Sequence, residues 1–82
     1  MAEKPTVGRI VIFTPPAGFV PTGNRSGTPG NGAKEFVAIV GQVFDGADYC
    51  NLFVMPPFAD AYWEGSVLEG EGPRTWRWPP RA

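Results

Sequence analysis

Short runs of β-branched and aromatic residues alternate with clusters of glycine and proline along the whole chain. Prolines follow three of these runs, and proline ends a strand because it has no N–H to donate to the ladder. No window of ten residues is free of glycine and proline while also showing an apolar stripe of helical period. The pattern therefore predicts no helix and five short strands, at residues 7–13, 35–44, 49–55, 61–68 and 75–78.

The second run is the most apolar of the five, and its near-continuous hydrophobicity predicts a central strand that is covered on both faces. The turn residues 45–48 (Asp-Gly-Ala-Asp) connect it to the third run, as in a hairpin. Five strands with hairpin-like connections favour a small, partly open barrel of the SH3-like or OB-like kind, because a sandwich normally needs more strands. We expect an all-β fold.

Residues 14–34 form a long Gly/Pro-rich loop with five glycines and four prolines. Loops of this length in compact domains are usually functional or mobile, and we expect a mobile one. Its one apolar pair, Phe19-Val20, either pins the loop to the body or meets a partner. The segment lacks the P-loop order of glycine, lysine and hydroxyl residue. A looser hypothesis is that Arg25, Lys34 and backbone N–H groups clasp an anion, although a solvated loop is the favoured interpretation.

The composition narrows the classes of function. A chain of 82 residues holds one core, so residues 1–82 are expected to be a single small β domain. The net charge of -1 argues against binding to long nucleic acids, and no apolar run approaches the length needed to cross a bilayer. Because so small a core gives limited stability, and because pairing edge strands between subunits buries more apolar area, we expect a homo-oligomer.

The chain has no histidine and one cysteine, Cys50. These counts exclude a structural zinc site and a Ser-His or Cys-His nucleophile. The acidic pairs Asp45/Asp48 and Glu69/Glu71 fall in expected turns, where carboxylates normally face solvent. Cys50 lies within a strand and is expected to be buried and inert. We therefore expect a protein that is not an enzyme and that uses no cofactor or metal. A single cysteine and the lack of a signal peptide favour the cytoplasm.

The most distinctive segment is the C-terminal one, where residues 73–81 contain two tryptophans and three arginines. In a strand, Trp76 and Trp78 share one face while Thr75 and Arg77 share the other. Either both indoles close the barrel, or one ring stays accessible between arginines and stacks a nucleobase or anchors a protein. Tyr62 and Trp63 are candidates for the opposing wall. The candidate ligand-binding residues are Trp76, Arg77, Trp78, Arg74, Tyr62, Trp63, Arg25 and Arg9.

Four segments carry a resemblance: Val7-Gly8-Arg9-Ile10-Val11, residues 38–40, residues 51–54, and the closing Thr75-Trp76-Arg77-Trp78-Pro79. The order resembles a group of small, mostly uncharacterised bacteriophage proteins with a Val-Gly-Arg-Ile-Val start and a Trp-x-Trp-Pro end. Members usually carry histidine where this chain has Ile12 and Arg77. The resemblance implies phage origin and expression in the cytoplasm of a bacterial host.

These observations lead to a non-enzymatic, phage-encoded binding protein. In its sharper form the hypothesis is a counter-defence sponge, which sequesters a nucleotide-derived host immune signal by stacking on an aromatic ring and pairing with arginine. The alternative is a structural or accessory protein of the virion, such as a head decoration or tail component, that acts by docking onto other proteins.

Overall fold

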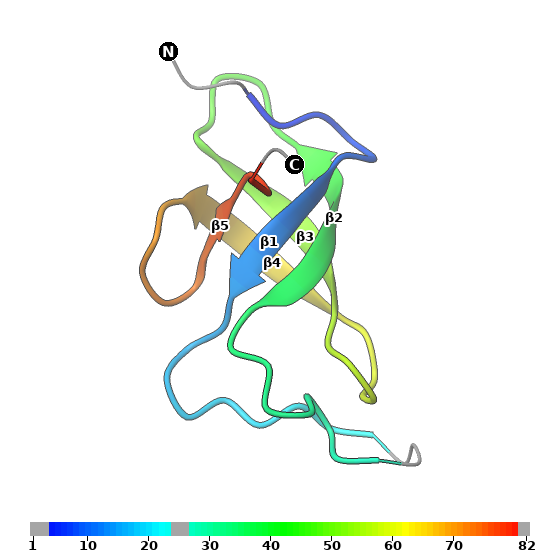
Figure 1. Cartoon of the computed structure of the whole chain (residues 1–82). Coiled ribbons are helices and arrows are strands. Elements are labelled where there is room, and N and C mark those ends of the chain that lie inside the picture. The colour runs from blue at the N-terminus through cyan, green and yellow to red at the C-terminus, as the bar shows by residue number, and fades with distance from the viewer. Residues whose placement is uncertain (1–3, 24–26, 81–82) are drawn as a thin grey trace.

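The structure is a computed structural model that describes residues 4–23 and 27–80. Five strands form one closed barrel, as Figure 1 shows. They are β1 (Ile10–Thr14), β2 (Phe36–Val43), β3 (Tyr49–Met55), β4 (Tyr62–Glu69) and β5 (Thr75–Arg77). The all-β class and the small five-stranded barrel are thereby confirmed, consistent with an SH3-like or OB-like fold. The described residues contain no helix.

The short strand β5 closes the barrel. Strands β1 to β4 pair with their sequence neighbours in antiparallel fashion. β5 then pairs with β1 in antiparallel fashion, with Phe13 opposite Trp76, and with β4 in parallel fashion, with Leu68 opposite Thr75. The three residues of β5 thus pair with residues 12–14 of β1 and with residues 68–69 at the end of β4.

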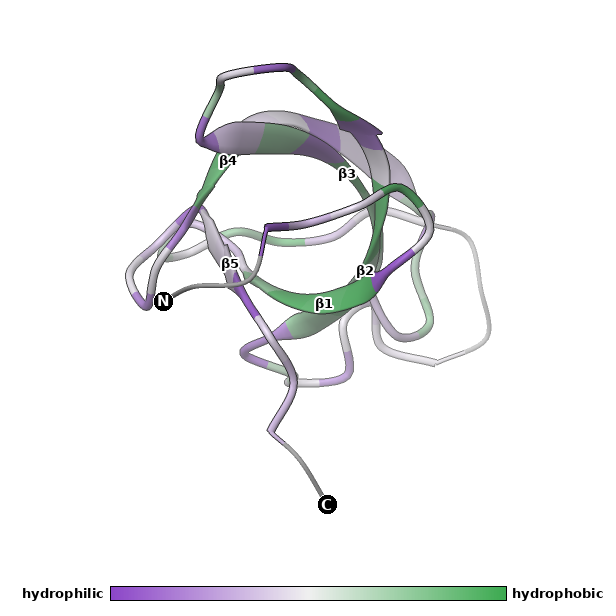
Figure 2. Cartoon of the chain, turned by 90° about the horizontal axis from the view of Figure 1, so that it is seen from above, coloured by the Kyte–Doolittle hydropathy of each residue, from purple (hydrophilic) through white to green (hydrophobic). Residues whose placement is uncertain are grey.

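The barrel interior is filled by side chains. Inward and outward positions alternate along the strands, as the two-residue period of a strand requires. Trp76 is 1% exposed and is the largest residue of the core. Figure 2, viewed from above, shows the strands arranged around this interior, with β1 apolar along its length. The buried core consists of Val11, Phe13, Phe36, Ala38, Val40, Cys50, Leu52, Val54, Val67 and Trp76.

The structure corrects the prediction that the strand at 35–44 is covered on both faces. Phe36, Ala38 and Val40 point inward and are buried, but Val37 between them is 45% exposed. In a barrel this small, one face of every strand points inward. None of the described residues forms a second layer over the outer face of the strands. The apolar residues on the outer face of β2 therefore lie at the surface.

The loop between β1 and β2 packs beside the connection between β3 and β4 (Figure 1). The Gly30 N–H donates to the carbonyl of Pro57 (2.7 Å), and the Asp60 N–H donates to the carbonyl of Thr22 (2.7 Å). The Phe19 ring packs against Tyr62, with 5.5 Å between ring centroids. Of the apolar pair in this loop, Phe19 therefore pins the loop to the body, whereas Val20 is exposed.

Candidate ligand-binding site

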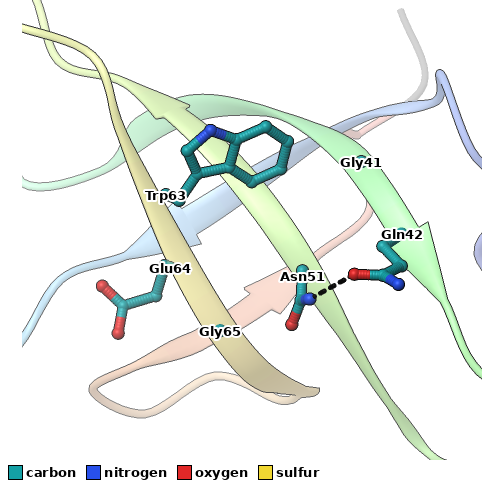
Figure 3. A pocket seen from close by; sticks show the side chains of 6 residues that line it. All are labelled: Gly41, Gln42, Asn51, Trp63, Glu64 and Gly65. Atoms are coloured by element: carbon teal, nitrogen blue, oxygen red, sulfur yellow. Dashed lines mark hydrogen bonds between the residues drawn. The ribbon is translucent and has the colours of Figure 1, made fainter.

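A depression opens on the outside of the barrel where two strands carry irregularities. Gly41 is an extra residue in the β2–β3 register, between Val40 and Gln42. In β4, Gly65 and Ser66 together lie opposite the single residue Asn51 of β3. Gly41 and Gly65 have no side chains to fill the space, which leaves a cavity of about 480 Å³ (Figure 3). This volume lies within the usual range of small-molecule sites.

One wall of the cavity is the indole of Trp63, which is 64% exposed. The ring leans across β3 towards Gly41 (Figure 3). It packs on Phe53, with 5.1 Å between ring centroids and 55° between the planes. A Cβ atom at Gly41 would stand 2.6 Å from Cη2 of the indole, so only glycine leaves room for the ring in this position. The contact with Phe53 and the absence of a side chain at Gly41 thus hold the exposed Trp63 ring in this orientation.

Two side-chain amides form the wall opposite Trp63. Asn51 Nδ2 donates to Gln42 Oε1 over 2.8 Å, and Asn51 Oδ1 accepts from the Ser66 N–H over 2.9 Å. These bonds hold Asn51 between two strands. The Gln42 amide nitrogen donates to no other described residue, so its N–H groups are available to a ligand. The wall therefore offers hydrogen-bond donors at a fixed place beside an aromatic ring.

Glu64 of β4 and Arg74 form an ion pair whose carboxylate points away from the Trp63 ring (Figure 3). Glu64 lines the cavity, and its Oε2 accepts from Arg74 Nη2 (2.6 Å) and Nε (3.1 Å). The pair joins β4 to the residue that precedes β5, and the Arg74 N–H also donates to the carbonyl of Thr14 (2.7 Å). Arg74 remains half exposed. The register partner of Glu64 is the buried Leu52, so the Glu64 carboxylate points away from the Trp63 indole (Figure 3), and Arg74 is held there by Glu64.

The two groups with shifted pKa values do not supply reactive chemistry. Burial raises the pKa of the Cys50 thiol, which keeps it protonated and unreactive. Burial, with a smaller contribution from the Glu64 charge, raises the pKa of Tyr62 to about 12. Cys50 is buried in the core, as the sequence predicted. Neither group faces the cavity, whose lining residues can stack and hydrogen-bond.

The structure separates the tryptophans of the C-terminal segment. Trp76 lies in the core, where it packs edge-on against Trp78 with 5.2 Å between ring centroids. Trp78 is partly buried, and the Arg9 guanidinium lies 4.7 Å from its ring centroid. Among the described residues, the indole nitrogens of both tryptophans are buried without a hydrogen-bond partner. This packing favours the interpretation in which the two rings close the barrel.

The remaining candidates from the sequence lie in different places. Arg77 donates to Glu35 Oε2 (Nη2, 2.6 Å; Nε, 3.2 Å), so a carboxylate already occupies it. Tyr62 and Trp63 do not form one wall, because neighbours in a strand point to opposite faces: Tyr62 packs against the core and Trp63 faces out. Arg25 lies outside the described residues. Of the seven candidates that the structure describes, only Trp63 lines the cavity, and Arg74 pairs with the lining residue Glu64.

Sequence reasoning missed the other residues that line the cavity: Gly41, Gln42, Asn51, Glu64 and Gly65. One available signal was the glycine inside the most apolar run of the chain. A glycine within a strand marks a bulge or a close approach, and Gly41 is at both. The pairing of Gln42 with Asn51 depends on strand register, which the pattern of apolar residues does not specify at a bulge.

Two searches of the described residues found nothing. Within residues 4–23 and 27–80, no three or more histidine, cysteine, aspartate or glutamate side chains gather where they could hold a metal ion. The same residues include no helix of the length and hydrophobicity that a membrane span requires.

Comparison with known proteins places the chain in no family. No protein family model, no curated protein and no solved structure matches it.

Proposed function

We propose that this protein is a non-enzymatic binding protein that holds a small planar ligand against Trp63. The observation that carries the proposal is the fixed, exposed indole beside a cavity of ligand size. Tryptophan is enriched at binding surfaces, because its ring combines a large apolar area with a polar N–H group. Here Gly41 and Phe53 hold the ring in place before any ligand arrives, which reduces the entropy lost on binding.

The cavity fits a nucleotide-derived ligand. A nucleobase has a flat π-face that stacks on an indole and an edge of donors and acceptors that amides can pair with. Trp63 offers the stacking surface, and Gln42 and Asn51 offer the amides. Arg74 is held by Glu64, whose carboxylate points away from the indole, so the contacts proposed here are stacking and hydrogen bonding. We thus propose Trp63 as the residue that stacks on the ligand, in place of Trp76 or Trp78, which the sequence indicated.

The biological role we propose is that of a phage counter-defence sponge, which sequesters a nucleotide-derived immune signal of the bacterial host. The resemblance to small phage proteins supports the phage origin. A sponge needs a binding site and no turnover, and stacking with hydrogen bonding meets that need.

Calorimetric titration of the purified protein with cyclic di- and trinucleotides, mononucleotides and ADP-ribose tests the ligand class. We expect one or more of them to bind. Trp63→Ala then weakens binding about 5- to 150-fold, because base–aromatic stacking is worth about 1–3 kcal/mol per base. Phe58→Ala removes another exposed aromatic that does not line the cavity, and it serves as the matched control. Absence of heat across the panel would reject the nucleotide ligand.

The second candidate function is a structural or accessory protein of the virion. The apolar side chains on the outside of β1 and β2 favour it, because docking onto a protein lattice requires such a surface. Mass spectrometry of purified particles separates the two candidates. A sponge is absent from the particle and is produced early in infection, whereas a virion protein is found there in stoichiometric amounts.

A further inference from the structure

Six outward positions on three adjacent strands of the barrel are apolar. Register aligns Ile10, Ile39 and Phe53 in one row across β1, β2 and β3, and Ile12, Val37 and Met55 in a second row. All six residues lie on strands that send the alternate positions into the core. We call these six residues the apolar face. The first row continues into β4 at Trp63, which pairs with Phe53 and marks the margin of the face.

The apolar face is exposed, and the positions beyond it are mixed: several are polar, whereas Val43, Tyr49 and Leu68 are also exposed. Ile10 is 55% exposed and Val37 is 45% exposed, while the other four members are partly buried by one another. Outward residues beyond this face include Gln42, Asn51, Ser66, Thr75 and Arg77. The six members of the apolar face lie on three adjacent strands, so they form one continuous apolar surface.

The size of the apolar face can be compared with that of a protein–protein interface. From their exposure, the six residues present on the order of 350 Å² of surface, within the range of the largest apolar patches on soluble monomers. A standard interface covers about 800 Å² per partner, of which roughly 60%, or about 480 Å², is apolar, so the face would supply most of that apolar area. The face is also contoured, because a cavity of about 360 Å³ lies among Ile10, Ile12, Glu35, Val37 and Pro79.

We propose that the apolar face is the interface with a second copy of this chain. A two-fold axis lays each apolar row against the same rows of the partner, and no charge is buried. At the rim, Arg77 is the register partner of Ile12 and pairs with Glu35 within one chain. When two copies are related by a two-fold axis, the arginine of one copy can lie near the glutamate of the other, so the two ion pairs are complementary. The net charge of -1 per chain gives little repulsion between copies.

Other occupants fit this surface less well. A nucleic acid or an anionic membrane requires basic side chains on the contact face, and the apolar face has none. An unrelated protein would need its own charges to match the Glu35–Arg77 pair, which a second copy does by symmetry. The inference does not depend on the ligand of the Trp63 cavity. It does place that cavity at the edge of the interface, because Trp63 borders both.

Sedimentation velocity of the purified full-length protein, from micromolar to submillimolar concentration, tests this proposal. We expect a species of twice the 8.9 kDa mass of one chain. Val37→Lys places a charge in the middle of the face and should return the mass to that of the monomer. Leu68→Lys places the same charge on an exposed leucine of β4 that lies outside the face, and it should leave the dimer intact.

A methyl NMR dilution series of the unmodified protein keeps the test decisive if Val37→Lys does not fold. The Ile10, Ile12 and Val37 methyl signals should shift with dilution, and those of Leu68 should not. A wild-type protein that stays monomeric over the whole concentration range overturns the proposal. So does a dimer that survives a folded Val37→Lys variant, or one whose concentration-dependent signals lie elsewhere. Loss of nucleotide binding with the dimer intact counts only against the proposed ligand.

Discussion

Replacing Gly41 by alanine tests whether the position of Trp63 depends on the missing side chain beneath it. The added methyl group would lie within 2.6 Å of Cη2 of the indole. Backbone geometry does not forbid alanine here, because Gly41 is not among the glycines with positive φ. The steric conflict therefore falls on the Trp63 ring, which must swing away from β2 and lose its contact with Phe53.

Two opposing effects set the magnitude. Trp63 buries about a third of its surface, roughly 90 Å² of about 250 Å², and at ~25 cal/mol per Å² the ring loses about 2 kcal/mol when it leaves. Alanine in a strand is more favourable than glycine by roughly 0.5–1 kcal/mol, because glycine loses more backbone entropy on folding. Gly41→Ala should therefore lower the free energy of unfolding by about 1–1.5 kcal/mol.

Urea denaturation of a double-mutant cycle measures this coupling. In the Trp63→Ala background the clash is gone, so the same Gly41→Ala change should stabilise the fold by roughly 0.5–1 kcal/mol. Gly72→Ala is the control, since its methyl group would have no atom within 4 Å. Should Gly41→Ala cost the same in both backgrounds, within about 0.5 kcal/mol, Gly41 does not position Trp63 and the account of the site is refuted.

Three further predictions follow from the buried groups. Trp76→Ala empties the largest position in the core and should lower the free energy of unfolding by about 3–5 kcal/mol, measured by urea denaturation followed by circular dichroism. Burial and a raised pKa protect the Cys50 thiol, so the native protein should not react with a thiol-specific chromogenic disulfide, whereas the denatured protein should release one equivalent. The pKa of Tyr62 is raised from 10.0 to about 12, so the unfolded chain loses this proton first as the pH rises. Stability should therefore be unaffected by this group below pH 10 and should fall between about pH 10 and 12. Tyr62→Phe should lower the free energy of unfolding only slightly at neutral pH, because the hydroxyl has no partner among the described residues. The same variant should show a smaller loss of stability at alkaline pH. Tyr49→Phe serves as the comparison. An unchanged alkaline decline in Tyr62→Phe would contradict the assignment.

The strands could be predicted from the sequence because proline and glycine mark their ends. The third strand lies at residues 49–55, as predicted, since a turn precedes it and Pro56 follows it. The first strand begins at Ile10 and not at Val7, because Gly8 adopts a φ of +94° that interrupts the extended chain. Local signals such as these are available without knowledge of the fold.

The candidate site depended on contacts between residues far apart in the sequence. The C-terminal arginines are conspicuous in the sequence, but it does not show that Glu35, 42 positions away, pairs with Arg77, or that Glu64 pairs with Arg74. The prominence of Trp76 and Trp78 reflects the needs of a small core more than exposure. Trp63 lines the candidate site, and only the register of β4 on β3 shows that it faces outward near Asn51.

A barrel of five short strands has no room inside for a ligand, because Trp76 and its neighbours fill the interior. A ligand would therefore have to bind on the outer surface of the barrel, where a regular strand ladder leaves no cavity. This chain breaks the ladder at Gly41 and at Gly65-Ser66, where Ser66 adopts a φ of +55°. Non-glycine residues with positive φ cost energy and are found where function requires them. The bulges create the cavity, and they also separate the polar wall at Gln42 from the apolar face that begins at Ile39. The two bulges thus separate the proposed ligand site from the apolar face that we propose binds a second copy.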